Sequence, residues 1–153
     1  MRILVKTVDE TQKLAAKLAK NVKAGDTILL SGDLGAGKTT FTQGFAKALG
    51  IKRPVKSPTF TLVREYQTAQ FPLYHLDVYR LGEEGNAEDL GLSEYFGGNA
   101  VALVEWSQYI KPDLPDDVLE IVFERVESSE TKRAITMTAA GERSSALLSE
   151  MEK

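Results

Sequence analysis

The amino-acid sequence predicts an α/β fold, in which a mixed parallel and antiparallel sheet is flanked by helices in three layers. Two observations support this prediction. A short β-rich run at residues 27–31 is followed by a glycine-rich loop and then by residues 40–49, whose apolar positions recur at helical period. Further along, residues 100–104 form a continuous apolar run, which is typical of a strand buried on both faces of a sheet.

The other elements are predicted from local patterns. Thr7 and Glu10 have the spacing of a helix-capping box, and the apolar residues behind them recur at helical period as far as Val22. The remaining segments are β-rich or amphipathic runs separated by turn residues. They predict a hairpin at 60–66 and 73–79, two further strands at 118–126 and 133–138, and a closing helix at 142–151.

Length and composition limit the possible classes of protein. A chain of 153 residues has the size of one domain, so we expect a single domain over residues 1–153. Hydrophobic residues make up 42% and charged residues 27%, which excludes wholesale disorder. The absence of cysteine excludes disulfides, thiolate metal sites and cysteine nucleophiles. Because the start lacks the apolar stretch of a signal peptide and no apolar run could span a bilayer, we expect a cytoplasmic protein with no membrane partner.

Charge is distributed unevenly along the chain, whose net charge is −3. Residues 1–66 carry 12 Lys and Arg against 5 Asp and Glu, whereas residues 67–153 carry 7 against 17. This segregation hints at a polar partner surface, but two solvated faces of one domain are the more common explanation. It gives no support to direct nucleic-acid binding by this chain alone.

The segment from Gly32 to Thr39 matches the phosphate-binding pattern G-x-x-x-x-G-K-[ST] in full and lies between a predicted strand and a predicted helix. Such a loop aims backbone N–H groups at phosphate oxygens, through backbone angles that a Cβ would resist. We expect Lys38 to face the β- and γ-phosphates and Thr39 to offer its hydroxyl oxygen to Mg²⁺. The pattern predicts a P-loop NTPase-like fold with ATP or ADP and Mg²⁺ as its cofactors. The residues expected at the nucleotide are Asp33, Leu34, Gly35, Ala36, Gly37, Lys38, Thr39 and Thr40.

Two carboxylates are candidates to complete this site. Glu105 follows the most apolar run, where a charge is costly unless the strand delivers it to a metal or a solvent-filled cleft. Asp77 lies in a predicted hairpin strand, where a polar residue on a wet face is the alternative interpretation. We expect Lys38, Asp77 and Glu105 to be catalytic, and Thr39 with Glu105 to hold Mg²⁺.

Three further positions are less strongly specified. Pro58 holds Ser57 in an extended conformation, and Thr59 is either a switch residue that reaches Mg²⁺ or a plain turn residue. His75 is the one histidine and has no metal-ligand companion nearby in sequence, so we expect a hydrogen-bonded strand residue. Trp106 follows Glu105, and strand alternation predicts that it points away from the face of that carboxylate, toward either core packing or a partner contact.

Four blocks of sequence together resemble one family. They are residues 32–41, 55–63, 74–81 and 103–106, and they occur in the order and spacing of the TsaE family, also called YjeE. The resemblance covers residues 3–141. It implies a slow bacterial ATPase that acts with the TsaB–TsaD heterodimer in forming threonylcarbamoyladenosine beside the anticodon of tRNAs reading ANN codons. The chain would then reach tRNA only indirectly, through that complex.

The resemblance also implies roles for particular residues. Gly35 to Thr39 would hold the phosphates, Thr39 and Glu105 would belong to the Mg²⁺ site, and Asp77 would lie near it. Ser57 and Thr59 fall in a switch-like loop. Val8, Glu10 and Arg133 match positions near the base of the nucleotide.

Two alternative functions stay open. A small P-loop kinase would need a second substrate pocket and a basic lid, but the segment between Asp77 and Glu105 offers only Arg80 among several acidic residues. A non-hydrolysing nucleotide-dependent interaction module would differ from an ATPase in its rate rather than in its fold.

Overall fold

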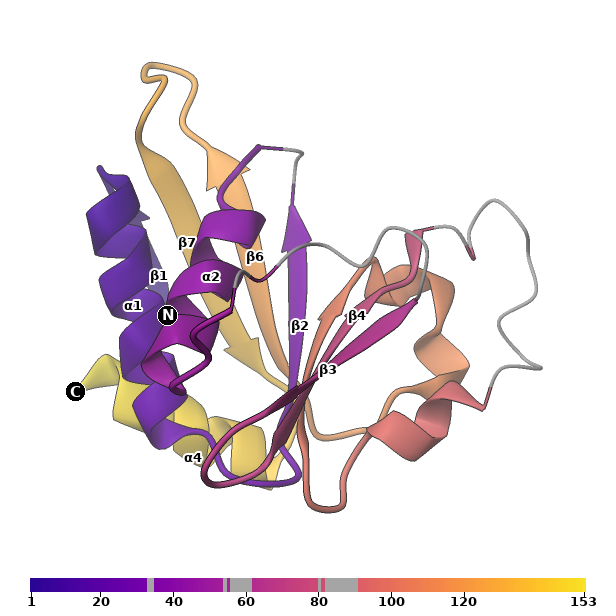
Figure 1. Ribbon diagram of the computed structural model, residues 1–153. Coiled ribbons are helices and arrows are strands. Elements are labelled where there is room, and N and C mark those ends of the chain that lie inside the picture. Colours follow the sequence, from indigo (N-terminus) through magenta and orange to yellow (C-terminus); the bar gives the residue numbers. More distant parts are fainter. Residues whose placement is uncertain (33–34, 54, 56–61, 80, 82–90) are drawn as a thin grey trace.

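The computed structural model describes residues 1–32, 35–53, 55, 62–79, 81 and 91–153 (Figure 1). Its strands form one seven-stranded sheet in the order β1-β7-β6-β2-β5-β4-β3. The strands are β1 (Arg2–Val5), β2 (Thr27–Gly32), β3 (Val63–Gln67), β4 (Pro72–Asp77), β5 (Val101–Glu105), β6 (Leu119–Arg125) and β7 (Arg133–Ala139). The helices are α1 (Val8–Asn21), α2 (Lys38–Ala48) and α4 (Glu142–Glu152), with short 3-10 turns at Leu92–Tyr95, Ser107–Tyr109 and Lys111–Asp113. None of the helices in the described part is long and apolar enough to cross a membrane.

The sheet is parallel at its centre and antiparallel at both edges, as the sequence predicts for a mixed α/β fold. Strand β2 pairs in parallel with β5 and β6, and β4 pairs in parallel with β5. The antiparallel pairs are β3 with β4, β6 with β7, and β1 with β7. Parallel strands bring their carboxyl ends to one edge of the sheet, the upper edge in Figure 1, where ligands bind in folds of this class.

Some predicted boundaries differ from the observed ones. Helix α2 begins at Lys38, two residues before the predicted start, because the phosphate loop leads directly into its first turn. Strand β1 was not predicted at all. Its four residues form a strand because they pair with β7, with Ile3 opposite Ile135, and such a distant pairing leaves no local signal.

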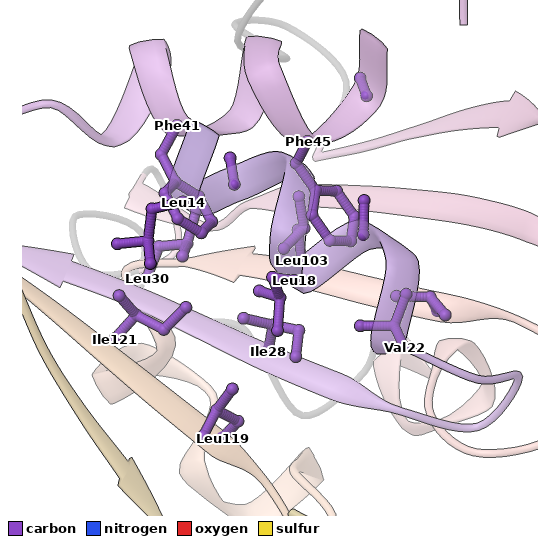
Figure 2. Packing of buried hydrophobic residues seen from close by; sticks show 14 of the residues in the cluster. Leu14, Leu18, Val22, Ile28, Leu30, Phe41, Phe45, Leu103, Leu119 and Ile121 are labelled. Atoms are coloured by element: carbon purple, nitrogen blue, oxygen red, sulfur yellow. The ribbon is translucent and has the colours of Figure 1, made fainter. Parts of the chain in front are cut away.

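One face of the sheet is covered by the three described α-helices. Figure 2 shows Leu18 of α1 with Phe41 and Phe45 of α2 above Ile28 and neighbouring strand residues. All four named side chains are fully buried, and each such burial contributes about 1.5–3 kcal/mol. Helix α4 joins the same cluster. The other residues labelled in this view are Leu14, Val22, Leu30, Leu103, Leu119 and Ile121.

The opposite face of the sheet packs against the 3-10 turns. Leu76 and Val104 point to this side and cluster with Leu92 and Ile110 from those turns. All five residues of β5 are buried, which confirms the prediction of a strand covered on both faces. The arrangement has three layers. It holds the carboxyl ends of β2, β4 and β5 rigidly beside the start of α2.

Candidate active site

The phosphate loop joins β2 to α2. Gly32, Gly35 and Gly37 have φ angles of 134°, 76° and 114°, so the backbone there takes the left-handed region that favours glycine. This confirms the reason given above for the glycines of the motif. Asp33 and Leu34 lie outside the described residues.

The N-terminus of α2 faces the open side of this loop. Gly37 is the N-cap residue of the helix. Because it has no side chain, it cannot accept hydrogen bonds from the free N–H groups of the first helical turn. The first α-helical backbone bond runs from the Phe41 N–H to the Gly37 oxygen, at 2.9 Å, and the preceding N–H groups have no partner within the helix. No acidic residue occupies the first turn. Free N–H groups and the positive end of the helix dipole make this end attractive to a phosphate group.

A cavity of about 320 Å³ lies between the phosphate loop and the ends of β4 and β5. Register explains why the two strand ends meet there, since Asp77 lies opposite Glu105 in the parallel pairing of β4 with β5. The sequence predicted that these carboxylates would lie beside the phosphate loop, and the structure brings them together with it. The lining residues are Gly35, Gly37, Lys38, Thr39, Thr40, Asp77, Glu105 and Trp106.

Glu105 is almost completely enclosed, with 7% of its surface exposed. Its Oε2 lies 2.8 Å from Nε2 of His75, which is itself 2% exposed. A buried carboxylate is tolerated when it is hydrogen-bonded, so the histidine accounts for part of the stability of Glu105 in this position. The prediction that His75 is a hydrogen-bonded strand residue is confirmed.

Asp77 is in a more open position than Glu105. It is half-buried at the last position of β4, and its Oδ1 accepts a hydrogen bond from the Tyr79 N–H at 3.2 Å. The two carboxylates of the cavity therefore have different surroundings. Glu105 is buried and fixed by a ring N–H, whereas Asp77 is held by a backbone N–H near the entrance.

The prediction for Trp106 holds only in part, because the residue packs against the buried cluster on the face opposite Glu105 and also reaches the cavity. Strand β5 ends at Glu105, and Trp106 takes a φ of 64°, the one positive φ at a non-glycine residue in the described ranges. Alternation therefore stops before this residue, and its side chain lines the same cavity as Glu105. The Nζ of Lys38 lies 4.9 Å from the centre of the indole ring. The centres of the Tyr79 and Tyr109 rings lie 4.8 Å and 6.1 Å from the centre of the indole ring.

Two arginines flank the phosphate loop on the side away from the carboxylates. Arg133, at the start of β7, has its Nη2 3.5 Å from the Gly35 oxygen. Arg125 ends β6 opposite Arg133, and its guanidinium lies against Gly35. The family resemblance indicated Arg133 only. Arg125 carries no separate signal, because the β2–β6 register, in which Gly32 lies opposite Phe123, brings the end of β6 to the loop.

Val8 and Glu10 lie at the start of α1. Val8 is 62% exposed, and the Glu10 carboxylate accepts a hydrogen bond from the Lys6 N–H at 2.6 Å. The Thr7 Oγ1 accepts from the Glu10 N–H at 3.1 Å, which confirms the predicted cap. Neither Val8 nor Glu10 is among the described residues that line the cavity. Ser57 and Thr59, the predicted switch residues, lie outside the described residues.

The oxygen ligands around the cavity fit magnesium. Mg²⁺ is commonly held by one or two carboxylates, while waters and phosphate oxygens complete its octahedron. Thr39, Asp77 and Glu105 supply a hydroxyl and two carboxylates to one cavity. Across the residues that the structure describes, no three His, Asp or Glu side chains are grouped closely enough to hold a metal ion by themselves. Such a site suits a cation that arrives with phosphates.

A larger cavity, of about 480 Å³, lies at the other end of α2. Its described lining contains neither a phosphate-loop residue nor a carboxylate, so the smaller cavity is the candidate active site. The described lining residues of the larger cavity are Gln43, Lys47, Gly50, Ile51, Lys52, Arg53 and Val55.

Residues 5–135 match the family model described as "Threonylcarbamoyl adenosine biosynthesis protein TsaE". The chain belongs to the TsaE family. The matched range contains all the described residues that line the candidate active site, so the resemblance carried by the four sequence blocks is confirmed.

Several members of the TsaE family are similar to this chain over most of its length. The tRNA threonylcarbamoyladenosine biosynthesis protein TsaE of Bacillus subtilis (strain 168) is 51% identical over 145 residues, which cover 95% of this chain and 89% of the relative. The protein of the same name from Aquifex aeolicus is 44% identical over 121 residues, which cover 78% of this chain and 84% of the relative. The crystal structure of Bacillus subtilis YdiB has a TM-score of 0.86 and 44% identity, covering 99% of this chain and 93% of that chain.

Proposed function

We propose that this TsaE-family chain binds Mg-ATP in the 320 Å³ cavity and hydrolyses it slowly to ADP and phosphate, in support of tRNA threonylcarbamoyladenosine biosynthesis. One observation carries the proposal. The phosphate loop, its lysine and two strand-end carboxylates from distant parts of the sequence line one cavity. A lysine that served packing alone would not require two carboxylates in the same cavity, whereas a site for Mg-ATP requires both kinds of charge.

The phosphates of ATP are the part of the substrate that this geometry suits best. The unpaired N–H groups at the start of α2 and the Lys38 ammonium would bind the β- and γ-phosphates. Lys38 is 8% exposed, so its charge acts in surroundings that water screens weakly. Val8, Glu10 and Arg133 would lie near the base, and the contact of Arg133 with Gly35 puts that arginine beside the phosphate loop.

Thr39 and Glu105 would hold Mg²⁺, with their hydroxyl and carboxylate oxygens as ligands. When bound, Mg²⁺ supplies positive charge that offsets the negative charge developing on the transferred phosphoryl group. Ser57 and Thr59 would form the loop that responds to the γ-phosphate.

The chain's own carboxylates would orient the attacking water. Oε2 of Glu105 is occupied by the His75 N–H, so Oε1 is the oxygen that can accept a hydrogen bond from the cavity side. Asp77 offers a second acceptor near the entrance. Lys38 would neutralise charge on the phosphate. The reaction then depends on positioning and electrostatics rather than on a covalent intermediate.

We also propose the partners. The relatives are named as tRNA threonylcarbamoyladenosine biosynthesis proteins, which supports a role in that pathway. From the family resemblance we propose that the chain is one ATPase domain of residues 1–153 that acts in the cytoplasm with a TsaB–TsaD heterodimer, where hydrolysis supports repeated turnover. It would meet tRNA only through that complex.

Phosphate release, measured with and without TsaB–TsaD, tests the proposal. We expect slow release by the chain alone and a changed rate when the heterodimer is added. An acceptor-dependent phosphorylated product would instead indicate a small P-loop kinase. Nucleotide binding with no phosphate release under either condition would indicate an interaction module.

A further inference from the structure

The buried contact between His75 and Glu105 joins the core to the cavity. His75 lies two residues before Asp77 on β4, and Asp77 is the register partner of Glu105 on β5. Alternation along parallel strands puts all three side chains on the face covered by α2. The Glu105 carboxylate therefore touches His75 on its core side through Oε2, and borders the cavity with the rest of its surface.

The direction of this hydrogen bond follows from the proposed role of Glu105. A carboxylate that holds Mg²⁺ is ionised and only accepts hydrogen bonds, so in that role Nε2 of His75 carries the proton and donates it. The other ring nitrogen, Nδ1, is buried and has no hydrogen-bond partner among the described residues. Glu105 is thus the polar group to which the ring of His75 is directed.

An imidazole at this position does not serve packing alone. The neighbours of His75 on the same face, Leu73 and Leu103, are apolar and buried, and an apolar residue would fill the same space without leaving a buried ring nitrogen unsatisfied. A half-satisfied buried polar group has a free-energy cost. That cost is explained if the N–H is needed at Glu105.

We propose that His75 is a positioning residue for Glu105, an inference that rests on the proposed ATPase function. By holding Oε2, the ring N–H fixes the rotation of the carboxylate and leaves Oε1 as the one oxygen presented to the cavity. Without the donor, the carboxylate is free to rotate, so neither oxygen is held at a fixed position toward the cavity. The orientation of the attacking water is then lost, while the phosphate contacts of Lys38 and the loop stay in place.

Three substitutions separate the donor from the volume of the side chain. His75→Gln keeps an N–H at about the reach of Nε2, whereas the amide of His75→Asn ends nearer the position of Nδ1, short of Glu105. His75→Leu has no donor. Leu103→Val is the matched control, because Leu103 is the register partner of His75 and changes packing at the same depth without removing a hydrogen bond.

We expect kcat for ATP hydrolysis to fall about 10- to 100-fold in the Asn and Leu variants, the usual loss when the partner of a ligand residue is removed. Their affinity for ADP should stay close to that of the wild type, because binding depends on the phosphate loop. His75→Gln and Leu103→Val should retain most of kcat. Thermal melts would verify that each variant is folded.

A second readout does not depend on turnover. His75 is the one histidine in the chain, so labelling histidine with nitrogen-15 gives the NMR signal of a single imidazole. We expect a proton on Nε2 that exchanges slowly with water, and a marked change of that signal in Glu105→Ala.

The outcomes distinguish failure of the His75 positioning role from failure of the proposed ATPase function. Wild-type turnover in folded His75→Asn and His75→Leu, or an imidazole signal indifferent to Glu105→Ala, would overturn the positioning role alone. A folded His75→Gln variant as slow as His75→Leu would also contradict it. Failure of the wild-type chain to hydrolyse ATP, alone and with TsaB–TsaD, would overturn the ATPase proposal and the positioning role with it.

Discussion

The ammonium nitrogen of Lys38 lies 4.9 Å from the centre of the Trp106 ring, over its face. A cation in this position is attracted by the negative face of the indole, more strongly where water is excluded. Phosphate oxygens would compete for the same ammonium group, since Lys38 belongs to the phosphate loop. The contact therefore couples nucleotide binding to the surroundings of the tryptophan.

The first prediction concerns tryptophan fluorescence. Because Trp106 is the chain's one tryptophan, emission reports on this site alone. We expect saturating Mg-ADP to change its intensity and wavelength, and Lys38→Met to change the spectrum of the nucleotide-free chain. An identical spectrum with and without bound nucleotide would contradict the coupling.

The second prediction separates the two carboxylates. Glu105→Gln keeps the size of the side chain and removes its charge, so ATP turnover should fall at least about 100-fold, as when a positioned proton acceptor is lost. ADP affinity should change little. Steady-state phosphate release and equilibrium binding would be compared with those of Asp77→Asn. Unchanged turnover in Glu105→Gln, with loss in Asp77→Asn, would assign the role to Asp77.

The third prediction concerns magnesium. Thr39→Val keeps the shape of the side chain and removes the hydroxyl oxygen, so added Mg²⁺ should no longer strengthen ATP binding as it does in the wild type. Binding of ADP in the presence of a chelator should be unaffected. Thr42→Val, further along α2 and outside the described cavity lining, is the control. A similar loss in both variants would indicate damage to the first turn of α2 rather than a ligand role for Thr39.

The fourth prediction concerns stability in acid. The Asp117 carboxylate accepts the N–H groups of Arg143 and Ser144 at 2.8 Å and 2.9 Å, and so caps α4 from a separate loop. Hydrogen bonds from the side chain and backbone of Ser144, and then from the Arg143 backbone, lower the pKa of Asp117 below its usual value. A carboxyl whose pKa is lowered by folding stabilises the folded state above its unfolded pKa and loses that contribution as the pH falls through the folded pKa.

The wild-type free energy of unfolding should therefore fall more steeply than that of Asp117→Asn below about pH 4, the ordinary range of an aspartate. At neutral pH, Asp117→Ala should cost about 1 kcal/mol, as other lost helix caps do. Urea unfolding at a series of pH values measures both effects. Asp116→Asn, which removes an exposed carboxylate from the same loop, should leave the pH profile unchanged.

Features encoded in contiguous residues could be predicted from the sequence. The phosphate loop, β2 and the body of α2 have strong local patterns, and the apolar run of β5 predicted both its burial and the delivery of Glu105 to an edge of the sheet. What could not be predicted depends on pairings between distant residues. Strand β1 exists because of β7, and Arg125 reaches Gly35 because of the β2–β6 register.

The part of the Trp106 prediction that failed has a local cause. Strand alternation ends at Glu105, where the backbone turns into the left-handed region, so the Trp106 side chain packs on the opposite face and still reaches the cavity. Nothing in the residue type signals that turn, since a tryptophan seldom adopts a positive φ. The His75–Glu105 contact likewise required the β4–β5 register, which joins segments 30 residues apart.

Calorimetric titration of the purified chain with Mg-ATP tests most directly whether the 320 Å³ cavity is a nucleotide site. We expect saturable heat with one site per chain. Lys38→Ala should weaken the affinity by about 10- to 100-fold, the loss of a charged hydrogen bond, while Lys47→Ala at the other end of α2 should not. No heat of binding from the folded wild-type chain, or equal weakening by the two substitutions, would contradict a phosphate site at the start of α2.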